Sequence, residues 1–217
     1  MIDETPAAWF AGGSIIMRLS ASRLTVERGG RIIFSNLTFA LERGESLTVT
    51  GPNGAGKSTL LRALAGLLPL ASGTVSLAPA SGDTLAEDVH YVGHADALKG
   101  LLTVAENLEF LAAILDAGNG GMAIDAALSV FGLLHTADLP VSYLSAGQKR
   151  RAALARLLVV RRPVWLLDEP TTALDAASQA AMREVMAAHL AQGGMIVAAT
   201  HARLGLKGQE LRLGAAA

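Results

Sequence analysis

Hydrophobic and polar residues alternate through the first fifty residues in a pattern that predicts several short strands. Residues 17–26 show a period close to two, which is typical of half-buried strands. Gly29-Gly30 marks a hairpin turn, and residues 32–41 continue the β character. A second turn at 42–45 precedes another β-rich run that ends near residue 50. We therefore expect antiparallel strands at the start of the chain.

The later pattern alternates between strands and helices. Helical periodicity follows the first strands at residues 60–65 and returns at 175–191. Short apolar runs predict further strands at residues 73–77, 89–93, 164–167, 195–200 and 211–213. Strands that alternate with helices imply an α/β fold with a mostly parallel sheet.

A helical block interrupts this alternation at about residues 98–158. Helices are predicted at 104–115, 123–131 and 145–159, with a turn at 116–121. Thr103 is a good N-cap for the first of them, and Glu106 stands at the capping-box position. We interpret the block as a helical subdomain inserted into the α/β core.

Composition limits the functional classes. The chain has 217 residues, 51% hydrophobic and 17% charged, so a sizeable core is expected. A net charge of −1 argues against a general electrostatic grip on nucleic acid. The absence of cysteine excludes disulfides and thiolate chemistry. The longest stretch without Asp, Glu, Lys or Arg, residues 63–82, is broken by glycine and proline, so no membrane span is expected.

Residues 1–16 precede any clear periodic pattern. We expect them to form a flexible extension, with 17–217 as the folded domain and Met17 as an alternative start. No basic region precedes an apolar one, so a secretory signal is not expected.

Residues 51–59 contain the strongest chemical signal. They read GPNGAGKST and match the spacing G-x-x-x-x-G-K-[ST] between a predicted strand and a predicted helix. Glycines let the backbone amides wrap phosphate groups, the lysine reaches the β- and γ-phosphates, and the hydroxyl after it ligates Mg²⁺. The residues expected to bind a nucleotide are Gly51, Pro52, Asn53, Gly54, Ala55, Gly56, Lys57, Ser58 and Thr59.

Two carboxylates follow the apolar strand 164–167. Asp168 and Glu169 stand at its carboxyl end, where open α/β sheets bind ligands. Beside a phosphate loop, Asp168 is placed to hold Mg²⁺ together with Ser58, and Glu169 to polarise the attacking water.

Residues 144–148 read LSAGQ just before an Arg- and Ala-rich helix. Ser145 is a good N-cap, and the exposed amides of that helix end suit an anion. The order of phosphate loop, helical insertion, LSAGQ, residues 166–170 (LLDEP), Asp175 and His201 resembles the ATP-binding subunit of ABC transporters from Met17 onward.

The resemblance implies roles for several residues. Ser145, Gly147 and Gln148 would close over the nucleotide of a second subunit, so two copies, or this chain and a related one, would sandwich two ATP molecules. Asp175 would belong to the segment that crosses the dimer interface, and His201 would contact the γ-phosphate. The implied fold is a RecA-like core with an antiparallel β subdomain and a helical subdomain.

Two positions depart from the usual family pattern. His94, in YVGH, stands where most members carry a Gln that senses Mg²⁺ or the attacking water. A neutral imidazole can accept a hydrogen bond from water; the alternative is a change without mechanistic weight. Arg28 stands where an aromatic residue usually stacks on adenine. A guanidinium plane also stacks on a base, although a solvated turn residue is the alternative.

These departures, with LSAGQKRR and Leu204-Gly205-Leu206 after His201, narrow the resemblance. They are similar to the ATP-binding subunit of bacterial cytochrome c maturation systems, often called the haem exporter ATPase. This implies a peripheral protein on the cytoplasmic face of the inner membrane, with a separate integral membrane partner. The five histidines form no axial-ligand motif, so we do not expect this subunit to bind haem.

Other interpretations stay open at this point. They are an ATPase of another small-substrate exporter, a soluble ABC ATPase that acts on DNA or ribosomes, and a phosphate-loop kinase. The first leaves the site residues unchanged. The second usually has paired cassettes or basic arms, and the third has no need of LSAGQ.

Overall fold

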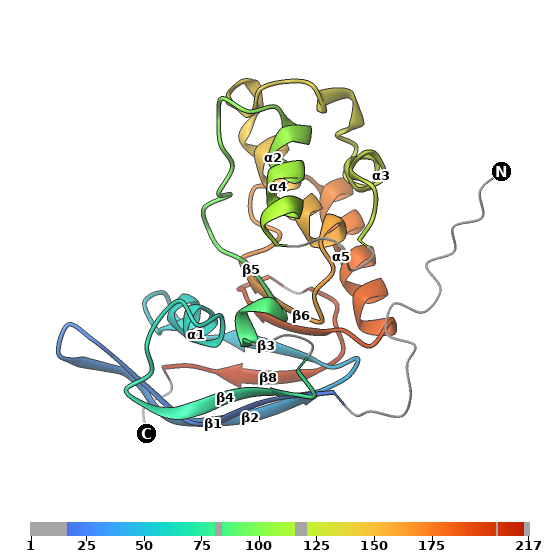
Figure 1. The fold of residues 1–217 in the computed structure, drawn as a ribbon. Helices are drawn as coiled ribbons and strands as arrows, with labels where there is room; N and C mark the ends of the chain where they lie inside the picture. Colours follow the sequence, from blue (N-terminus) through green and yellow to red (C-terminus); the bar gives the residue numbers. More distant parts are fainter. Residues whose placement is uncertain (1–16, 81–83, 116–120, 203, 215–217) are drawn as a thin grey trace.

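The computed structural model describes residues 17–80, 84–115, 121–202 and 204–214. The predicted extension at 1–16 and most of the predicted turn at 116–121 lie outside these residues. The described chain contains two sheets, a three-stranded and a five-stranded one. A lobe of helices stands over one end of the larger sheet (Figure 1).

The smaller sheet is antiparallel and comes mainly from the start of the chain. β1 (Arg18–Arg28) pairs with both β2 (Arg31–Glu42) and β4 (Ser72–Ala78), in the order β2-β1-β4. The predicted turn at Gly29-Gly30 is present, with φ values of 58° and 72° that suit glycine. The antiparallel pairing predicted for the strands within residues 17–41 is confirmed. The predicted run that ends near residue 50 is instead part of the parallel sheet.

The larger sheet is parallel, as the alternating pattern predicted. Its order is β5-β6-β7-β3-β8, and every neighbouring pair runs in the same direction. The strands are β3 (Ser46–Thr50), β5 (Val89–Val92), β6 (Val164–Asp168), β7 (Met195–Ala199) and β8 (Gln209–Arg212). The carboxyl ends of β3 and β6 therefore meet at one edge of the sheet.

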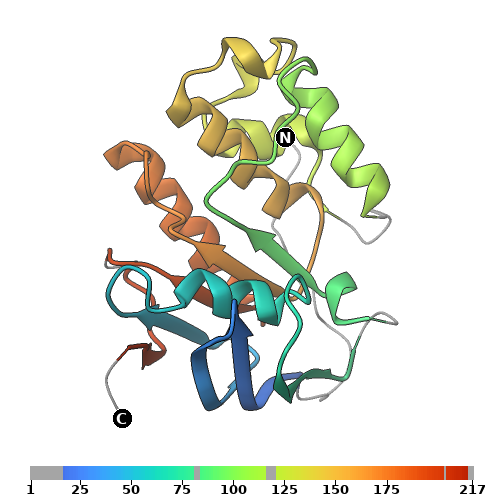
Figure 2. The same cartoon turned by 90° about the vertical axis from the view of Figure 1, so that its left-hand side faces the viewer.

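The helices divide between the two sides of the large sheet (Figures 1 and 2). α1 (Lys57–Leu64) follows β3 and packs against β6, β7 and β1. α5 (Ala176–Ala191) packs against β7. The helical lobe contains α2 (Val104–Ile114), α3 (Ile124–Val130) and α4 (Ala146–Val159), which contact one another. Short 3-10 turns are η1 (Leu85–Glu87), η3 (Leu134–Thr136) and η4 (Val141–Tyr143).

Alternate residues of the central strands belong to different hydrophobic clusters. Val164 and Leu166 of β6 pack with α1 and the antiparallel sheet, whereas Trp165 and Leu167 pack with the helical side. This follows from the strand period of two, which directs successive side chains to opposite faces. On β7, Met195, Val197 and Ala199 join the first cluster, and Ile196 and Ala198 join the second.

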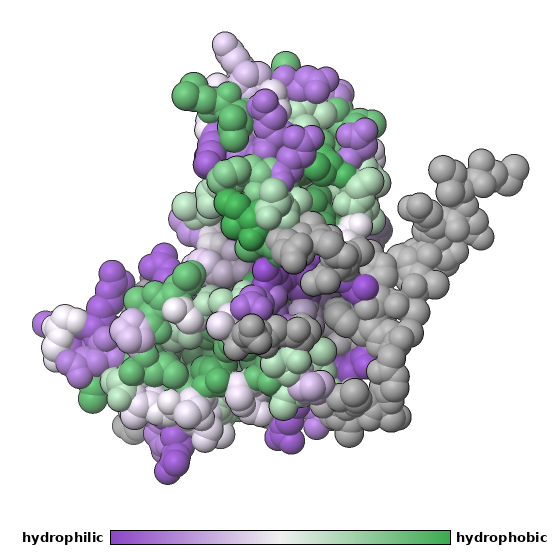
Figure 3. All heavy atoms as spheres, in the orientation of Figure 1, coloured by the Kyte–Doolittle hydropathy of each residue, from purple (hydrophilic) through white to green (hydrophobic). Residues whose placement is uncertain are grey.

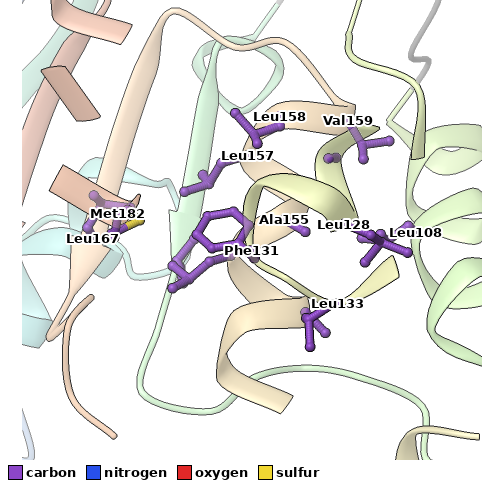
Figure 4. Packing of buried hydrophobic residues seen from close by; sticks show 14 of the residues in the cluster. Leu108, Leu128, Phe131, Leu133, Ala155, Leu157, Leu158, Val159, Leu167 and Met182 are labelled. Atoms are coloured by element: carbon purple, nitrogen blue, oxygen red, sulfur yellow. The ribbon is translucent and has the colours of Figure 1, made fainter. Parts of the chain in front are cut away.

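The helical lobe is held by its own apolar interior. Phe131, Leu128 and Leu108 meet residues of α4, and Leu167 and Met182 extend the same cluster toward the sheet (Figure 4). This continuity makes the lobe part of the domain core. No described helix is long and apolar enough to cross a membrane.

Candidate functional site

The phosphate loop joins β3 to α1, and two of its glycines, Gly51 and Gly56, stand where a Cβ would collide with neighbouring atoms. Gly51 has φ 138°, and a Cβ there would lie 2.3 Å from the carbonyl oxygen of Leu213. Gly56 has φ 98°, and a Cβ there would lie 2.6 Å from Cγ2 of Ile33. Gly56 is also the N-cap of α1 and supplies no side-chain cap. The helix therefore starts with backbone amides that no side chain caps, which suits an anion.

Lys57 brings its charge to the centre of this loop. Its Nζ donates to the carbonyl oxygens of Gly51 at 2.8 Å and Pro52 at 3.0 Å, and lies 3.1 Å from Nε2 of His201. The same ring nitrogen lies 3.1 Å from Oδ1 of Asn53. The two residues predicted to contact the γ-phosphate, Lys57 and His201, are thus adjacent although 144 positions separate them.

The carboxylate pair lies at the carboxyl end of β6. Asp168 is 4% exposed, and its Oδ2 is buried with no hydrogen-bond partner among the described residues. Glu169 has φ 49°, an uncommon conformation for a residue with a side chain. Its backbone N–H donates to Ala199 at 2.9 Å, and its Oε2 accepts a hydrogen bond from the Thr200 hydroxyl at 3.2 Å. These contacts hold the backbone and the carboxylate of Glu169 in place directly after β6.

A cavity of about 390 Å³ brings most of the predicted site together. It is lined by Arg28, Ile33, Asn53, Gly54, Gly56, Lys57, Ser58, Thr59, His94, Asp168 and Glu169. Gly51, Pro52 and His201 line a neighbouring cavity of about 740 Å³. Ala55 closes the loop between them through a 3.2 Å hydrogen bond from its amide to Pro52.

The donor set fits a nucleotide-bound Mg²⁺. Ser58 and Asp168, whose Oδ2 is unpartnered, line the same cavity, and hard oxygen donors are what Mg²⁺ prefers. The described residues contain no cluster of three or more His, Cys, Asp or Glu able to hold a metal. A cation that takes its other ligands from phosphate and water does not need such a cluster.

Both departures from the family pattern lie at this cavity. Arg28, at the end of β1, and the exposed His94, after β5, are among its lining residues. Ile33 of β2 lies beside them and against Gly56. Sequence reasoning missed Ile33, because nothing in the predicted strand at 32–41 signals contact with the phosphate loop.

The LSAGQ end of α4 does not line the cavity. Ser145 accepts a hydrogen bond from the amide of Gln148 at 3.2 Å, and the Gln148 side chain accepts one from the amide of Ser145 at 2.8 Å. A Cβ on Gly147 would lie 3.3 Å from the carbonyl oxygen of Ala173. Asp175 caps α5, and hydrogen bonding to Ser178 lowers the pKa of its carboxyl. These four predicted residues lie apart from the chain's own phosphate loop.

Comparison with known proteins agrees with this geometry. A family model described as ABC transporter matches residues 34–172, more than half of the chain. The chain belongs to the ABC transporter family. As a member of that family it binds ATP and is an ATP-hydrolysing subunit of the transporter type. The prediction from motif order is confirmed.

Relatives in this family include proteins named cytochrome c biogenesis ATP-binding export protein CcmA. The one from Nitrobacter winogradskyi is 55% identical over 202 residues, covering 93% of this chain and 100% of the relative. That from Mesorhizobium japonicum is 53% identical, covering 92% and 100%. That from Paramagnetospirillum magneticum is 52% identical, covering 89% and 93%.

Solved structures support the fold assignment. A chain described as an ABC transporter ATP-binding protein from Pyrococcus furiosus superposes with a TM-score of 0.77 at 22% identity, covering 90% of this chain and 97% of that one. An ATP-binding subunit of an ABC transporter gives 0.75 at 26% identity, covering 84% and 79%. The predicted ABC-type α/β fold is thus confirmed.

Proposed function

We propose that this protein hydrolyses ATP to energise a membrane ABC complex in cytochrome c biogenesis, in haem export or in release of the haem chaperone. The carrying observation is a cavity that brings Lys57, Asp168 and Glu169 together in a chain 52–55% identical to several CcmA proteins. Those relatives are named for cytochrome c biogenesis and export. Energising another small-substrate exporter is the alternative that leaves the same site unchanged.

Each site residue has its own role in the proposed reaction. Lys57 and the loop amides neutralise phosphate charge, and His201 beside Lys57 orients the γ-phosphate. Glu169 polarises the attacking water, and His94 across the cavity accepts a hydrogen bond from that water. Arg28 stacks on the base. Ser58 and Asp168 would hold Mg²⁺, which would neutralise charge at the phosphates.

A second subunit completes the site. Ser145, Gly147, Gln148 and Asp175 lie apart from the chain's own cavity, so they are free to act on a nucleotide held by another copy. The Ser145 oxygen already accepts from Gln148, so its hydroxyl proton is the part left to donate to a phosphate. A homodimer in the ATP state satisfies both sites alike.

Exposed apolar side chains on the helical lobe suit an integral membrane partner. Leu101 is 93% exposed, Tyr143 80% and Ile114 62%, and Figure 3 shows green patches on that lobe. Large exposed apolar residues are common at protein interfaces. Leu101 follows His94 by seven residues, so a partner bound at Leu101 would lie near the loop that carries His94. We place the protein on the cytoplasmic face of the inner membrane, with no nucleic acid partner and no haem of its own.

Glu169→Gln tests the hydrolytic assignment. We expect hydrolysis to fall by at least about 100-fold because the water loses its polarising carboxylate, while ATP binding persists and a dimer accumulates. Turnover by phosphate release and mass by light scattering give the two readouts. Wild-type turnover in this variant would refute the role of Glu169, and an inactive monomer with bound ATP would refute the dimer.

Affinity purification of the tagged chain from membranes of its host tests the partner. Recovery of one integral membrane subunit, lost on Leu101→Glu but retained on Leu67→Glu, is expected; Leu67 is also exposed, at 61%, but lies after α1. Loss of cytochrome c assembly in a deletion strain then separates this function from another exporter. Recovery of ribosomes or nucleic acid in place of a membrane protein would favour the soluble ATPase.

A further inference from the structure

Arg150 is a buried cation that joins three motifs of the site. It lies on α4, five residues after Ser145, and is 5% exposed. Its guanidinium donates to four oxygens: the carbonyls of Gly93 at 2.9 Å, Asp168 at 3.0 Å and Glu169 at 2.9 Å, and a carboxylate oxygen of Asp96 at 3.2 Å. One side chain thus touches both residues of the carboxylate pair and both flanks of the His94 loop.

The two ends of the guanidinium have separate tasks. Nη1 holds the loop that carries His94, through Gly93 and Asp96. Nη2 holds the backbone of Asp168 and Glu169, where Glu169 has its uncommon positive φ. The planar fork of arginine makes both sets of bonds at once, which a lysine ammonium cannot reproduce.

A second arginine on the same helix holds the strand just before this loop. Arg156 donates through Nη2 to the carbonyl oxygen of Tyr91. Burial, with Arg150 nearby, lowers the pKa of Arg156 to about 10. Two arginines of α4 therefore donate hydrogen bonds to the backbone around the end of β5, at Tyr91 and Gly93. Arg150 differs from Arg156 because it alone of the two also reaches the carboxylate pair.

We propose that Arg150 is a positioning residue for hydrolysis, which sets His94 and Glu169 relative to each other and links both to the LSAGQ end of its own helix. A displacement of the start of α4, as when LSAGQ meets a nucleotide on another subunit, then shifts the water-facing residues of the chain's own site. Arg150 touches no atom of ATP in this role, so ATP affinity does not depend on it. The inference rests on the roles proposed for His94 and Glu169.

Steady-state kinetics of Arg150→Gln and Arg150→Lys test the proposal. We expect kcat to fall by about 10- to 100-fold in both variants, because the loss of fork geometry misplaces the reacting groups, while ATP affinity changes less than about twofold. Arg183→Gln is the matched control, since Arg183 is exposed on α5 and outside the site. A fall in ATP affinity matched by an unchanged kcat would overturn the proposal.

A double-mutant cycle with His94→Ala distinguishes positioning from general support of the fold. If Arg150 acts through His94, the effects on kcat do not multiply, and Arg150→Gln/His94→Ala is about as slow as the slower single variant. Multiplying effects would overturn the coupling. Asp96→Asn weakens one of the four bonds without altering α4; we expect a smaller fall in kcat of the same kind, and no fall would count against the loop arm.

The two hypotheses fail differently. Wild-type turnover in Glu169→Gln would remove the hydrolytic role on which the proposal depends. An inactive Glu169→Gln together with a fully active Arg150→Gln would leave that role intact and refute the inference alone. Thermal unfolding of each variant with bound ATP identifies any that lose activity by failing to fold.

Discussion

Two helix starts in this molecule treat their backbone amides in opposite ways. α1 begins at Gly56, which offers no side-chain cap. α4 has Ser145 as its N-cap, and a capping box with Gln148 satisfies the amides of both residues. Both ends carry a partial positive charge. The start of α1 offers the backbone amides of the phosphate loop. The start of α4 offers fewer hydrogen-bond donors, namely the Ser145 hydroxyl and the amides that follow it. This difference fits the two proposed roles, in which the start of α1 holds phosphate and the start of α4 closes over the phosphate of another subunit.

The matched substitutions Gly56→Ala and Gly147→Ala should separate these two tasks most strongly. At Gly56 the new Cβ meets Ile33 at 2.6 Å with φ 98°, so we expect ATP affinity to fall by roughly 100-fold as the loop distorts. At Gly147 the nearest atom is the Ala173 carbonyl oxygen at 3.3 Å. We expect that variant to bind ATP normally as a monomer and to lose turnover by roughly tenfold, because the added methyl group would hinder closure over the nucleotide of the other subunit.

Isothermal titration with ATP and phosphate release measure the two quantities. A non-hydrolysable ATP analogue in place of ATP keeps the nucleotide intact during titration, and dilute protein keeps the chain monomeric. If Gly147→Ala weakened ATP binding to the monomer as much as Gly56→Ala does, the distinction between the two helix ends would be lost.

Ser145→Ala should show a medium effect, with Thr103→Ala as its control. Thr103 forms the same kind of capping box on α2 with Glu106. Each substitution removes one cap and should reduce the free energy of unfolding by about 1 kcal/mol. Turnover should fall in Ser145→Ala alone, because of these two residues only Ser145 is proposed to donate a hydrogen bond to a phosphate. Urea unfolding and hydrolysis assays measure both; equal turnover in the two variants would make Ser145 a cap and nothing more.

Asp175 at the start of α5 provides a third, ionised helix cap with the smallest expected effect. The hydrogen bond that the Ser178 amide donates to the Asp175 carboxylate holds the pKa of that carboxyl below the ordinary 3.8. A lowered folded-state pKa stabilises the fold above the unfolded value, and this contribution disappears as pH falls through the folded value. The stability difference between wild type and Asp175→Asn should therefore shrink below about pH 4. Urea unfolding at pH 7 and pH 3.5 measures it; a constant difference would exclude the ionised cap.

Much of the site could be predicted because its chemistry is local in sequence. The loop 51–59, the pair Asp168 and Glu169, and Ser145 each combine a residue type with a fixed spacing and a predicted element. The strands and helices followed from their periods, with ends displaced by a few residues: the last strand, expected at 211–213, is Gln209–Arg212. Such ends depend on pairing with β3, which the local pattern does not contain.

The contacts between residues far apart in the sequence could not be predicted. Arg150 was visible only as a basic residue in LSAGQKRR, yet its partners lie up to 57 positions away. Ile33 stands in a predicted strand, and its contact with Gly56 depends on how two sheets pack. The stacking of Trp165 on His189, 3.7 Å apart, likewise requires β6 and α5 in place. Contacts of this kind depend on tertiary geometry, and a single sequence gives no spacing rule for them.

The alternation of β6 and β7 between two hydrophobic clusters has a consequence for how the chain folds and unfolds. Release of the helical lobe from the sheet would expose Trp165, Leu167 and Ile196, which are fully or almost fully buried. The other faces of the same two strands complete the interior shared with α1 and the antiparallel sheet. Neither the helical lobe nor the part with α1 and the antiparallel sheet has a complete hydrophobic core without β6 and β7. The described chain should therefore unfold in one cooperative transition and not as separate units.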